Sequence, residues 1–384
     1  MSDPDIPEAD TVHGARHPRF APRVIGHEAA EAAFLDAYNS GRMHHAWLVH
    51  GPKGVGKATL AWRIARFLLD QPGDAGGGLF GAPEVPHSLD VDPESGPARR
   101  ANALTEQRLC LVRRAWDEKS GKLKSQITVD EVRKLNTFFQ MSSADGGRRV
   151  VIVDAADEMN TSAANALLKQ LEEPPAGATI LLISHQPSRL LPTIRSRCRD
   201  LRLSPLDAPQ MAQALANAQD DIDGGPDPDQ DGHTQALAQL ASGSVGEALR
   251  LMNMDGIAVY GELVSLFAAL PDLDRTRALK LAESAAGRGN AERFDLIIRL
   301  MDMFLTRLAR TGAGAPPVVE AARAEADVMR RLAPDAHAAR VWATLQQELS
   351  ARATHARAVN LDPAALILDM VLKVNETARP LAAG

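Results

Sequence analysis

The chain has 384 residues, of which 45% are hydrophobic and 24% charged, and its formal net charge is −6. This length predicts two or three domains, and the composition is typical of a soluble globular protein. The acidic total excludes a surface that binds nucleic acid throughout, although a local basic patch remains open. No run of about eighteen apolar residues is present, so we expect no membrane span and a cytoplasmic location. The two cysteines form neither a zinc site nor a disulfide framework by themselves.

The N-terminal third combines a polar start with the first core elements. We expect residues 1–20 to form a flexible arm, because they are polar and interrupted by proline. A helix is predicted over 28–38, a buried strand over 46–50 and an amphipathic helix over 59–69. Residues 70–106 are rich in glycine and proline, which predicts an irregular insertion.

Apolar strands then alternate with helical segments. Strands are predicted over 109–112, 150–153, 178–184 and 200–203, and helices over 131–139, 159–173 and 188–194. Strands that are apolar on both faces indicate a parallel sheet covered by helices. We therefore predict an α/β domain over 21–204.

The strand pattern ends at Pro205. Helices over 208–218 and 234–240 and a further helix after Gly243 predict a small helical domain at 205–255, interrupted by the acidic loop 219–232. Residues 256–384 are helix-patterned throughout, with segments at 259–270, 276–285, 291–308, 318–329, 335–355 and 363–376. The predicted fold class is therefore α/β followed by all-α, with a separate C-terminal helical domain.

A split nucleotide site is the central motif. The stretch Gly51-Pro52-Lys53-Gly54-Val55-Gly56-Lys57 has the spacing of a phosphate-binding loop, in which backbone N–H groups surround a phosphate and the lysine reaches the terminal phosphates. A strand precedes this loop and a helix follows it, as such a loop requires. The strand at 150–153 ends in Asp154, which supplies the second half of the site.

Two further motifs carry a resemblance to a known family. Leu167 to Pro175 reads LLKQLEEPP and contains Glu172 and Glu173, and a Ser196-Arg197-Cys198 triplet follows. Placed after a phosphate loop, these motifs resemble the bacterial clamp-loader subunits of the AAA+ superfamily. The resemblance spans residues 20–255 and implies a P-loop domain and a helical lid, with the C-terminal helices as the family's oligomerisation collar.

Three positions depart from the ATP-hydrolysing motor subunits of that family. Ala58 replaces the Ser or Thr that ligates Mg²⁺, Ala155 replaces the glutamate that orients water, and Gly246 replaces a phosphate-contacting arginine. Because losing one well-placed catalytic group commonly costs a factor of roughly 10² to 10³, we expect negligible hydrolysis here. The retained glycines and Lys57 leave room for weak ATP or ADP binding. In the alternative interpretation, Lys57 only caps its helix.

Arg197 is the candidate functional residue. In the family, the arginine of the Ser-Arg-Cys motif contacts the γ-phosphate of ATP in the neighbouring subunit, as an arginine finger does. A defective own site with an intact finger is typical of the δ′ class. The alternative is that Arg197 belongs only to a solvated basic edge formed by Arg189, Arg195, Arg197, Arg199 and Arg202. We expect Cys198 to be a small buried residue and not a nucleophile.

The resemblance also implies partners. These are gamma/tau motor subunits and a delta subunit, with the sliding clamp and primed DNA contacted through the complex. The chain would then be part of the DNA-directed DNA polymerase III holoenzyme, a nucleotidyltransferase assembly, without an ATPase activity of its own. Many relatives carry a four-cysteine zinc module in the insertion, but this insertion has no cysteine, so we expect no zinc and no required cofactor.

Three other functions stay open. An active AAA+ motor subunit would release phosphate as the purified chain. A P-loop kinase would need a second substrate pocket and a lid, of which the sequence gives no sign. A DNA-binding protein could use Arg148, Arg149 or the lysines at 119–124, and would show salt-dependent binding.

Overall fold

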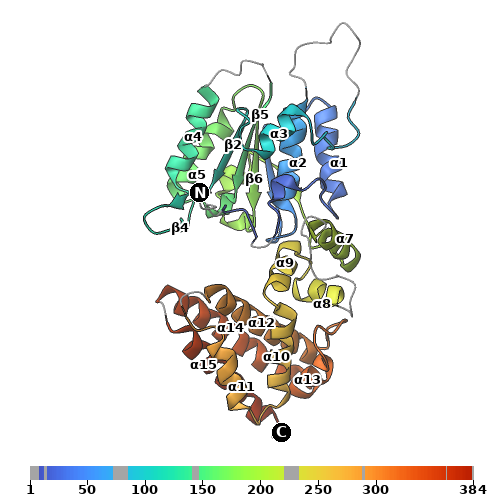
Figure 1. Cartoon of the computed structure of the whole chain (residues 1–384), viewed down its shortest axis with the longest axis vertical. Coiled ribbons are helices and arrows are strands. Elements are labelled where there is room, and N and C mark those ends of the chain that lie inside the picture. The colour runs from blue at the N-terminus through green and yellow to red at the C-terminus, as the bar shows by residue number, and fades with distance from the viewer. Residues whose placement is uncertain are drawn as a thin grey trace, which may run out of the picture. The chain divides into compact units, whose positions relative to one another are not determined.

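The chain forms an α/β region followed by helices (Figure 1). The computed structural model describes residues 8–12, 15–71, 85–140, 147–219, 233–287, 290–359 and 361–382. Contacts divide the chain into two units, residues 1–225 with 243–246 and residues 226–242 with 247–384. The predicted fold class, α/β and then all-α, is confirmed.

The α/β unit is built on one five-stranded parallel sheet. Its strands lie in the order β2-β5-β6-β1-β7 and comprise β1 (Ala46–His50), β2 (Leu109–Arg113), β5 (Arg149–Asp154), β6 (Ala178–Ser184) and β7 (Arg199–Arg202). Parallel neighbours cannot be joined by tight hairpins, so the connections cross over the faces of the sheet. All carboxyl ends therefore meet at one edge, where the phosphate loop and Asp154 lie.

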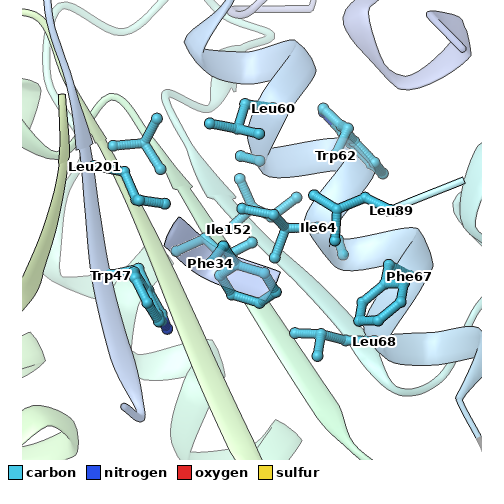
Figure 2. Close-up of a cluster of buried hydrophobic side chains, with 14 of the residues drawn as sticks. Phe34, Trp47, Leu60, Trp62, Ile64, Phe67, Leu68, Leu89, Ile152 and Leu201 are labelled. Atoms are coloured by element: carbon cyan, nitrogen blue, oxygen red, sulfur yellow. The ribbon is translucent and has the colours of Figure 1, made fainter. Parts of the chain in front are cut away.

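Helices cover both faces of this sheet (Figure 1). One face carries α1 (Glu28–Asn39), α2 (Lys57–Asp70) and α3 (Gly96–Asn102), and the other carries α4 (Val129–Gln140) and α5 (Thr161–Glu172). Successive strand side chains enter opposite cores, so Trp47 packs with α1 and α2 whereas Leu48 packs with α4 and α5. Figure 2 shows the first of these cores, with Trp47 beside Phe34 and the apolar face of α2.

Two predictions in the N-terminal half need correction. The stretch expected to be irregular contains helix α3, which begins with Ser95 as cap and has Pro97 in its first turn, both standard start signals. Residues 72–84 of that insertion and all but the first residue of the acidic loop 219–232 lie outside the described residues. The described part of the expected arm is held against the sheet domain by ion pairs and a 3₁₀ turn, η1 (Pro18–Phe20).

Several short elements complete this unit. They are β3 (Trp116–Asp117), β4 (Lys122–Leu123), η2 (Ala156–Glu158), η3 (Pro187–Arg189), α6 (Pro192–Arg195) and α7 (Ala208–Gln219). β3 and β4 form an antiparallel hairpin that the sequence patterns did not predict. The single helix expected over 188–194 is two short turns, because Pro192 lacks the N–H needed to continue a helix.

The regular elements described after residue 219 are all helices. The helices are α8 (His233–Leu240), α9 (Val245–Asn253), α10 (Gly256–Ala268), α11 (Arg275–Glu283), α12 (Ala291–Gly312), α13 (Glu325–Leu332), α14 (Ala336–Ala358) and α15 (Pro363–Ala382). α13 begins at Glu325 and not at Val318, whose side chain is 96% exposed. Contacts place α7 in the first unit and α8 in the second, so the lid at 205–255 stays a prediction. Of the helices described, none combines the length and apolar character needed to cross a bilayer.

A buried charge cluster ties three of these helices together. The Glu325 carboxylate is fully buried and accepts hydrogen bonds from the Tyr260 hydroxyl (2.5 Å) and from Arg307 Nε (2.7 Å) and Nη2 (3.0 Å). The Ala321 N–H donates a further bond at 2.6 Å. Because a buried carboxylate is costly unless every lone pair is satisfied, this cluster fixes α10, α12 and α13 in one register.

Candidate functional site

The loop between β1 and α2 has the backbone of a phosphate-binding loop. Gly51, Gly54 and Gly56 all have positive φ angles, of +150°, +78° and +100°. An added Cβ at Gly51 would lie 2.2 Å from the backbone oxygen of Leu203, and one at Gly54 would lie 2.3 Å from Oγ of Ser244. Both the backbone conformation and the available space therefore require glycine at these positions.

Lys57 is turned onto its own loop. Its side chain is buried, and Nζ donates hydrogen bonds to the carbonyl oxygens of Gly51 (2.8 Å) and Pro52. Burial lowers the pKa of Lys57 to about 8, although the carboxylates of Asp154 and Asp157 act in the opposite direction. These two bonds use two of the three N–H donors of the ammonium group, so a phosphate that takes more than one hydrogen bond from Lys57 must replace a carbonyl.

Asp154 ends β5, and its negative charge acts on Lys57 of the loop more strongly than that of Asp157 does. Burial raises the pKa of Asp154 to about 7, and the negative charge of Asp10 raises it further, while Lys57 opposes both effects. Ligation of Mg²⁺ by this carboxyl group would therefore release a proton when it is bound in its protonated form, because metal ligation needs the ionised form.

The two carboxylates that follow Asp154 are engaged elsewhere. Asp157 accepts hydrogen bonds from the backbone N–H groups of His185 (2.9 Å) and Gln186 (3.2 Å), so it holds the turn after β6. Glu158 Oε2 pairs with Arg114 Nε at 2.7 Å. Ala155 has no carboxylate to orient an attacking water, and both of these neighbouring carboxylates already have partners.

The other two departures from the motor pattern also lie at the loop. Ala58 presents a methyl group where a hydroxyl would ligate Mg²⁺. The backbone N–H of Gly246 donates to the carbonyl of Gly54 at 3.0 Å, and a Cβ at position 246 would lie 3.1 Å from the Gly54 Cα. Position 246 therefore contacts the loop through its backbone and has no room for a side chain without a shift.

Arg197 lies outside this site, between α6 and β7. Its side chain is 35% exposed, Nη1 donates to the Thr193 carbonyl at 2.9 Å, and Nη2 pairs with Glu172 Oε1 at 2.8 Å. The Glu172 side chain is 49% exposed. Arg197 is thus positioned by its own chain but is not buried in it.

The remaining motif residues shape this corner of the fold. Ser196 Oγ donates to the Thr193 carbonyl (3.2 Å) and Cys198 Sγ to the Ile194 carbonyl (3.2 Å). Burial raises the pKa of Cys198 to about 12, so the sulfur is a thiol at neutral pH and a poor nucleophile. Glu173 is exposed and follows the last residue of α5.

The predicted site residues thus form two groups. Gly51, Gly54, Gly56, Lys57 and Asp154 converge at the carboxyl edge of the sheet, whereas Glu172, Ser196, Arg197 and Cys198 meet at the end of α5. No hydrogen bond or ion pair joins the two groups in the part of the chain that the structure describes. Within the same residues, no cluster of three or more His, Cys, Asp or Glu is placed to hold a metal ion. The absence of zinc stays a prediction.

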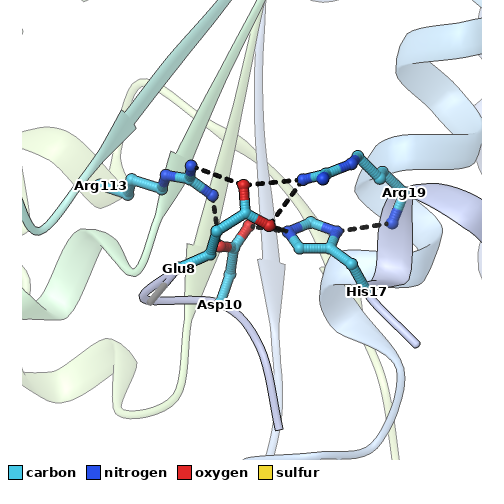
Figure 3. A network of polar contacts seen from close by, with 5 residues as sticks. All are labelled: Glu8, Asp10, His17, Arg19 and Arg113. Carbon is cyan, nitrogen blue, oxygen red and sulfur yellow. Dashed lines mark hydrogen bonds and ion pairs between the residues drawn. The ribbon is translucent and has the colours of Figure 1, made fainter. Parts of the chain in front are cut away.

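A network of five side chains beside the site was missed by the sequence analysis (Figure 3). Arg113 pairs with Asp10 (Nη1 to Oδ1, 2.6 Å) and with Glu8 (Nη2 to Oε1, 2.9 Å). Arg19 also donates to Glu8, and His17 Nε2 lies 3.0 Å from Asp10 Oδ2. A signal was present, since Arg113 directly follows an apolar strand whose carboxyl end reaches the same edge as Asp154.

Two histidines next to the loop were also missed. His27 Nε2 lies 2.7 Å from the Val55 carbonyl oxygen, inside the loop. His185 directly follows β6, and burial together with the Lys57 charge lowers the pKa of His185 to about 4, so it is neutral at pH 7. The position of His185 at a strand end could have identified it, whereas nothing in the sequence connects His27 with the loop.

Comparison with known proteins shows what this arrangement resembles. The family described as "DNA polymerase III, delta subunit" matches residues 26–207, which contain the sheet, the loop and the Arg197 motif. The delta′ subunit of DNA polymerase III from Pseudomonas aeruginosa is 34% identical over 250 residues, covering 62% of this chain and 65% of the relative. Residues 26–207 thus match this family, and the chain is similar to a DNA polymerase III subunit over about two thirds of its length.

Other DNA polymerase III subunits are similar as well. The Escherichia coli delta′ subunit is 30% identical over 231 residues, covering 57% of this chain and 58% of that protein. The E. coli tau subunit is 28% identical over 277 residues, covering 72% of this chain and 39% of that protein. The chain therefore spans less than two thirds of the length of these relatives. The family resemblance predicted from the LLKQLEEPP and Ser-Arg-Cys motifs is confirmed.

Proposed function

We propose that this chain is a non-hydrolysing clamp-loader subunit that presents Arg197 to ATP bound by a neighbouring motor subunit. The contrast between the two groups of residues carries this proposal. The group at the phosphate loop, which comprises Gly51, Gly54, Gly56, Lys57 and Asp154, lacks catalytic side chains of the motor subunits, and Lys57 is hydrogen-bonded to its own loop. Arg197, in contrast, keeps a partly exposed guanidinium. Such a subunit contributes to hydrolysis only in trans.

The group at the phosphate loop supports nucleotide binding better than ATP hydrolysis. With Ala58 there is no hydroxyl for the metal, and with Ala155 there is no carboxylate for the attacking water. Since each loss costs roughly two orders of magnitude or more, their combination leaves no useful turnover. The loop backbone and Lys57 remain as phosphate ligands, which is consistent with weak binding of ATP or ADP.

Arg197 has the chemistry for a γ-phosphate. A guanidinium offers several donors in a planar fork that matches phosphate oxygens, and it stays charged at every relevant pH. Its ion pair with Glu172 is exposed, and such pairs contribute only about 0–1 kcal/mol. The charge of a neighbour's triphosphate can therefore replace Glu172 at little cost.

The proposed partners follow from this role. Gamma/tau-type motor subunits would supply the ATP that Arg197 contacts, and a delta subunit would complete the ring. The sliding clamp and primed DNA would be engaged through the assembled complex. The C-terminal helices would serve as the collar that holds the subunits together.

The test is reconstitution with motor and delta subunits. The Arg197→Ala variant should assemble normally but lose turnover at the one site it serves by a factor of about 10³ or more, as loss of an arginine finger does. Arg202→Ala, which removes an exposed arginine from β7, is the matched control and should turn over normally. Normal ATPase and clamp loading with Arg197→Ala would refute the proposal.

The complete glycine geometry of the loop also supports a rival function, an active motor subunit. That rival predicts ATP-dependent phosphate release by the purified chain alone. It further predicts that Lys57→Ala abolishes this release, whereas our proposal predicts no release to abolish.

A further inference from the structure

The segment before α1 is fastened across the nucleotide site, and we call residues 8–12 and 15–22 the N-terminal strap. Two buried arginines of α2 hold its later part. Arg66 donates to the carbonyl oxygens of Arg19 and Ala21 (2.7 Å to Ala21), and Arg63 donates to the carbonyl of Pro22. The strap is therefore tied to the helix that begins at the phosphate loop.

The earlier part of the strap carries two carboxylates into a cationic setting. Glu8 lies between Arg113 and Arg19, and Asp10 lies between Arg113 and His17 (Figure 3). The side chains of Asp10 and His17 are each only 4% exposed. This is a built network, because isolated surface pairs do not exclude water to that extent.

The network lies on the side of the loop where a metal and phosphates would be bound. Arg113 is the register partner of Asp154 on the neighbouring strand. The His17 ring packs edge-on against Trp62, with centroids 5.9 Å apart. Trp62 is four residues after Ala58 on α2, so it shares the helix face from which a metal-ligating hydroxyl would project.

A further observation agrees with this placement. Val12 reaches position 246, where an added Cβ would lie 3.6 Å from Val12 Cγ2, and Gly246 itself contacts Gly54 of the loop. The strap thus runs from Arg113, the register partner of Asp154, to Gly246, which contacts the loop at Gly54.

We propose that the strap is a built-in occupant of the nucleotide site, and that a magnesium–nucleoside triphosphate binds only when the strap is displaced. The carboxylates of Glu8 and Asp10 neutralise Arg113 and Arg19, which would otherwise attract a polyanion. They also place negative charge where the phosphates would lie, so the two anions exclude each other. This inference concerns the chain's own site and does not depend on the role of Arg197.

Binding of a fluorescent ATP analogue with Mg²⁺ to the full chain tests the proposal. In the Glu8→Gln, Asp10→Asn double variant the strap keeps its size but loses its two negative charges. The fraction of molecules with the strap displaced should then grow, and the affinity for the ATP analogue should rise by about tenfold or more. Glu262→Gln with Glu376→Gln, two exposed glutamates of the C-terminal helices, changes the net charge equally and should leave affinity unchanged. Equal affinity of both double variants, or no binding by either, would overturn the proposal.

A second measurement uses the unaltered chain, in case the double variant does not fold. Backbone amides of residues 8–12 and 15–19 should exchange with deuterium several-fold faster in the presence of millimolar Mg-ATP than without it. Exchange in α14, which lies in the other unit, should stay constant. No change at the strap amides, whether or not ATP binds, would overturn the inference.

Discussion

The two charged groups of the α/β unit differ in how their charges are satisfied. Lys57 and Asp154 lie inside the fold, with pKa values moved by burial toward neutrality and with Lys57 bonded to its own loop. Arg197 lies at the surface, where its main partner is an exposed glutamate. In the inner group, which comprises Lys57, Asp154 and the loop glycines, a substitution alters packing or charge inside the fold. In the outer group, which comprises Arg197 and Glu172, the partners can be exchanged at little cost. This difference is the one that the proposed role of Arg197 in trans requires.

The largest stability effect should come from crowding the inner group. Gly51→Ala places a methyl group 2.2 Å from the Leu203 carbonyl oxygen, so the loop or β7 must move. We expect a loss of about 2–4 kcal/mol in the free energy of unfolding, measured by denaturant titration. Gly41→Ala is the matched control, because Gly41 also has positive φ but nothing lies within 4 Å of its added Cβ. Equal losses in the two variants would mean that the inner group is not tightly packed.

The pH dependence of the unfolding free energy should distinguish Asp154, whose pKa is raised, from an exposed carboxyl group. The folded-state pKa of Asp154 is about 7, above its usual 3.8, so the folded protein binds this proton more tightly than the unfolded chain does. Stability from this group is therefore present at low pH and is lost as the pH rises through 7.

Asp154→Asn removes that loss. Its stability advantage over the unaltered chain should widen by on the order of 2 kcal/mol between pH 5 and pH 7.5, less what is lost with the attraction to Lys57. Thermal unfolding across this pH range measures it. Asp272→Asn, at an exposed position in the helical unit, should show no such widening. An advantage independent of pH would contradict the raised pKa of Asp154.

The smallest effect should come from the outer group. Glu172→Gln removes the charge that pairs with Arg197, and because this pair is exposed the unfolding free energy should fall by less than about 1 kcal/mol. Glu173→Gln, at the adjacent exposed position, serves as control. A loss above about 2 kcal/mol for Glu172→Gln alone would show that Arg197 is bound too firmly to serve a neighbour.

The sequence predicted the inner group better than its surroundings. Glycine spacing and the apolar strands located Lys57 and Asp154, because parallel strands bring their carboxyl ends to one edge. The strap was not predicted, since its contacts join Glu8 and Asp10 to Arg113, more than a hundred residues away, and no periodicity reports such pairing. The ion pair of Arg197 with Glu172 was missed for the same reason.

The start of one helix was predicted wrongly and another helix was not predicted. Val318 carries an apolar side chain that helical spacing placed inside a helix, yet it is exposed and the helix begins at Glu325. That start depends on Tyr260 and Arg307, which satisfy Glu325 from other helices. Helix α3 was missed although Ser95 and Pro97 signal its start, because the surrounding glycines and prolines dominated the composition.

The contact between Gly246 and Gly54 limits the side chains that position 246 can hold. Any side chain at position 246 presses on the loop, since even a Cβ there would lie 3.1 Å from the Gly54 Cα. An arginine at position 246 would therefore require the loop to shift. Under the proposed function, positions 58, 155 and 246 would all have to change before this site could hydrolyse ATP, so no single substitution would supply the metal ligand, the base and the phosphate contact together.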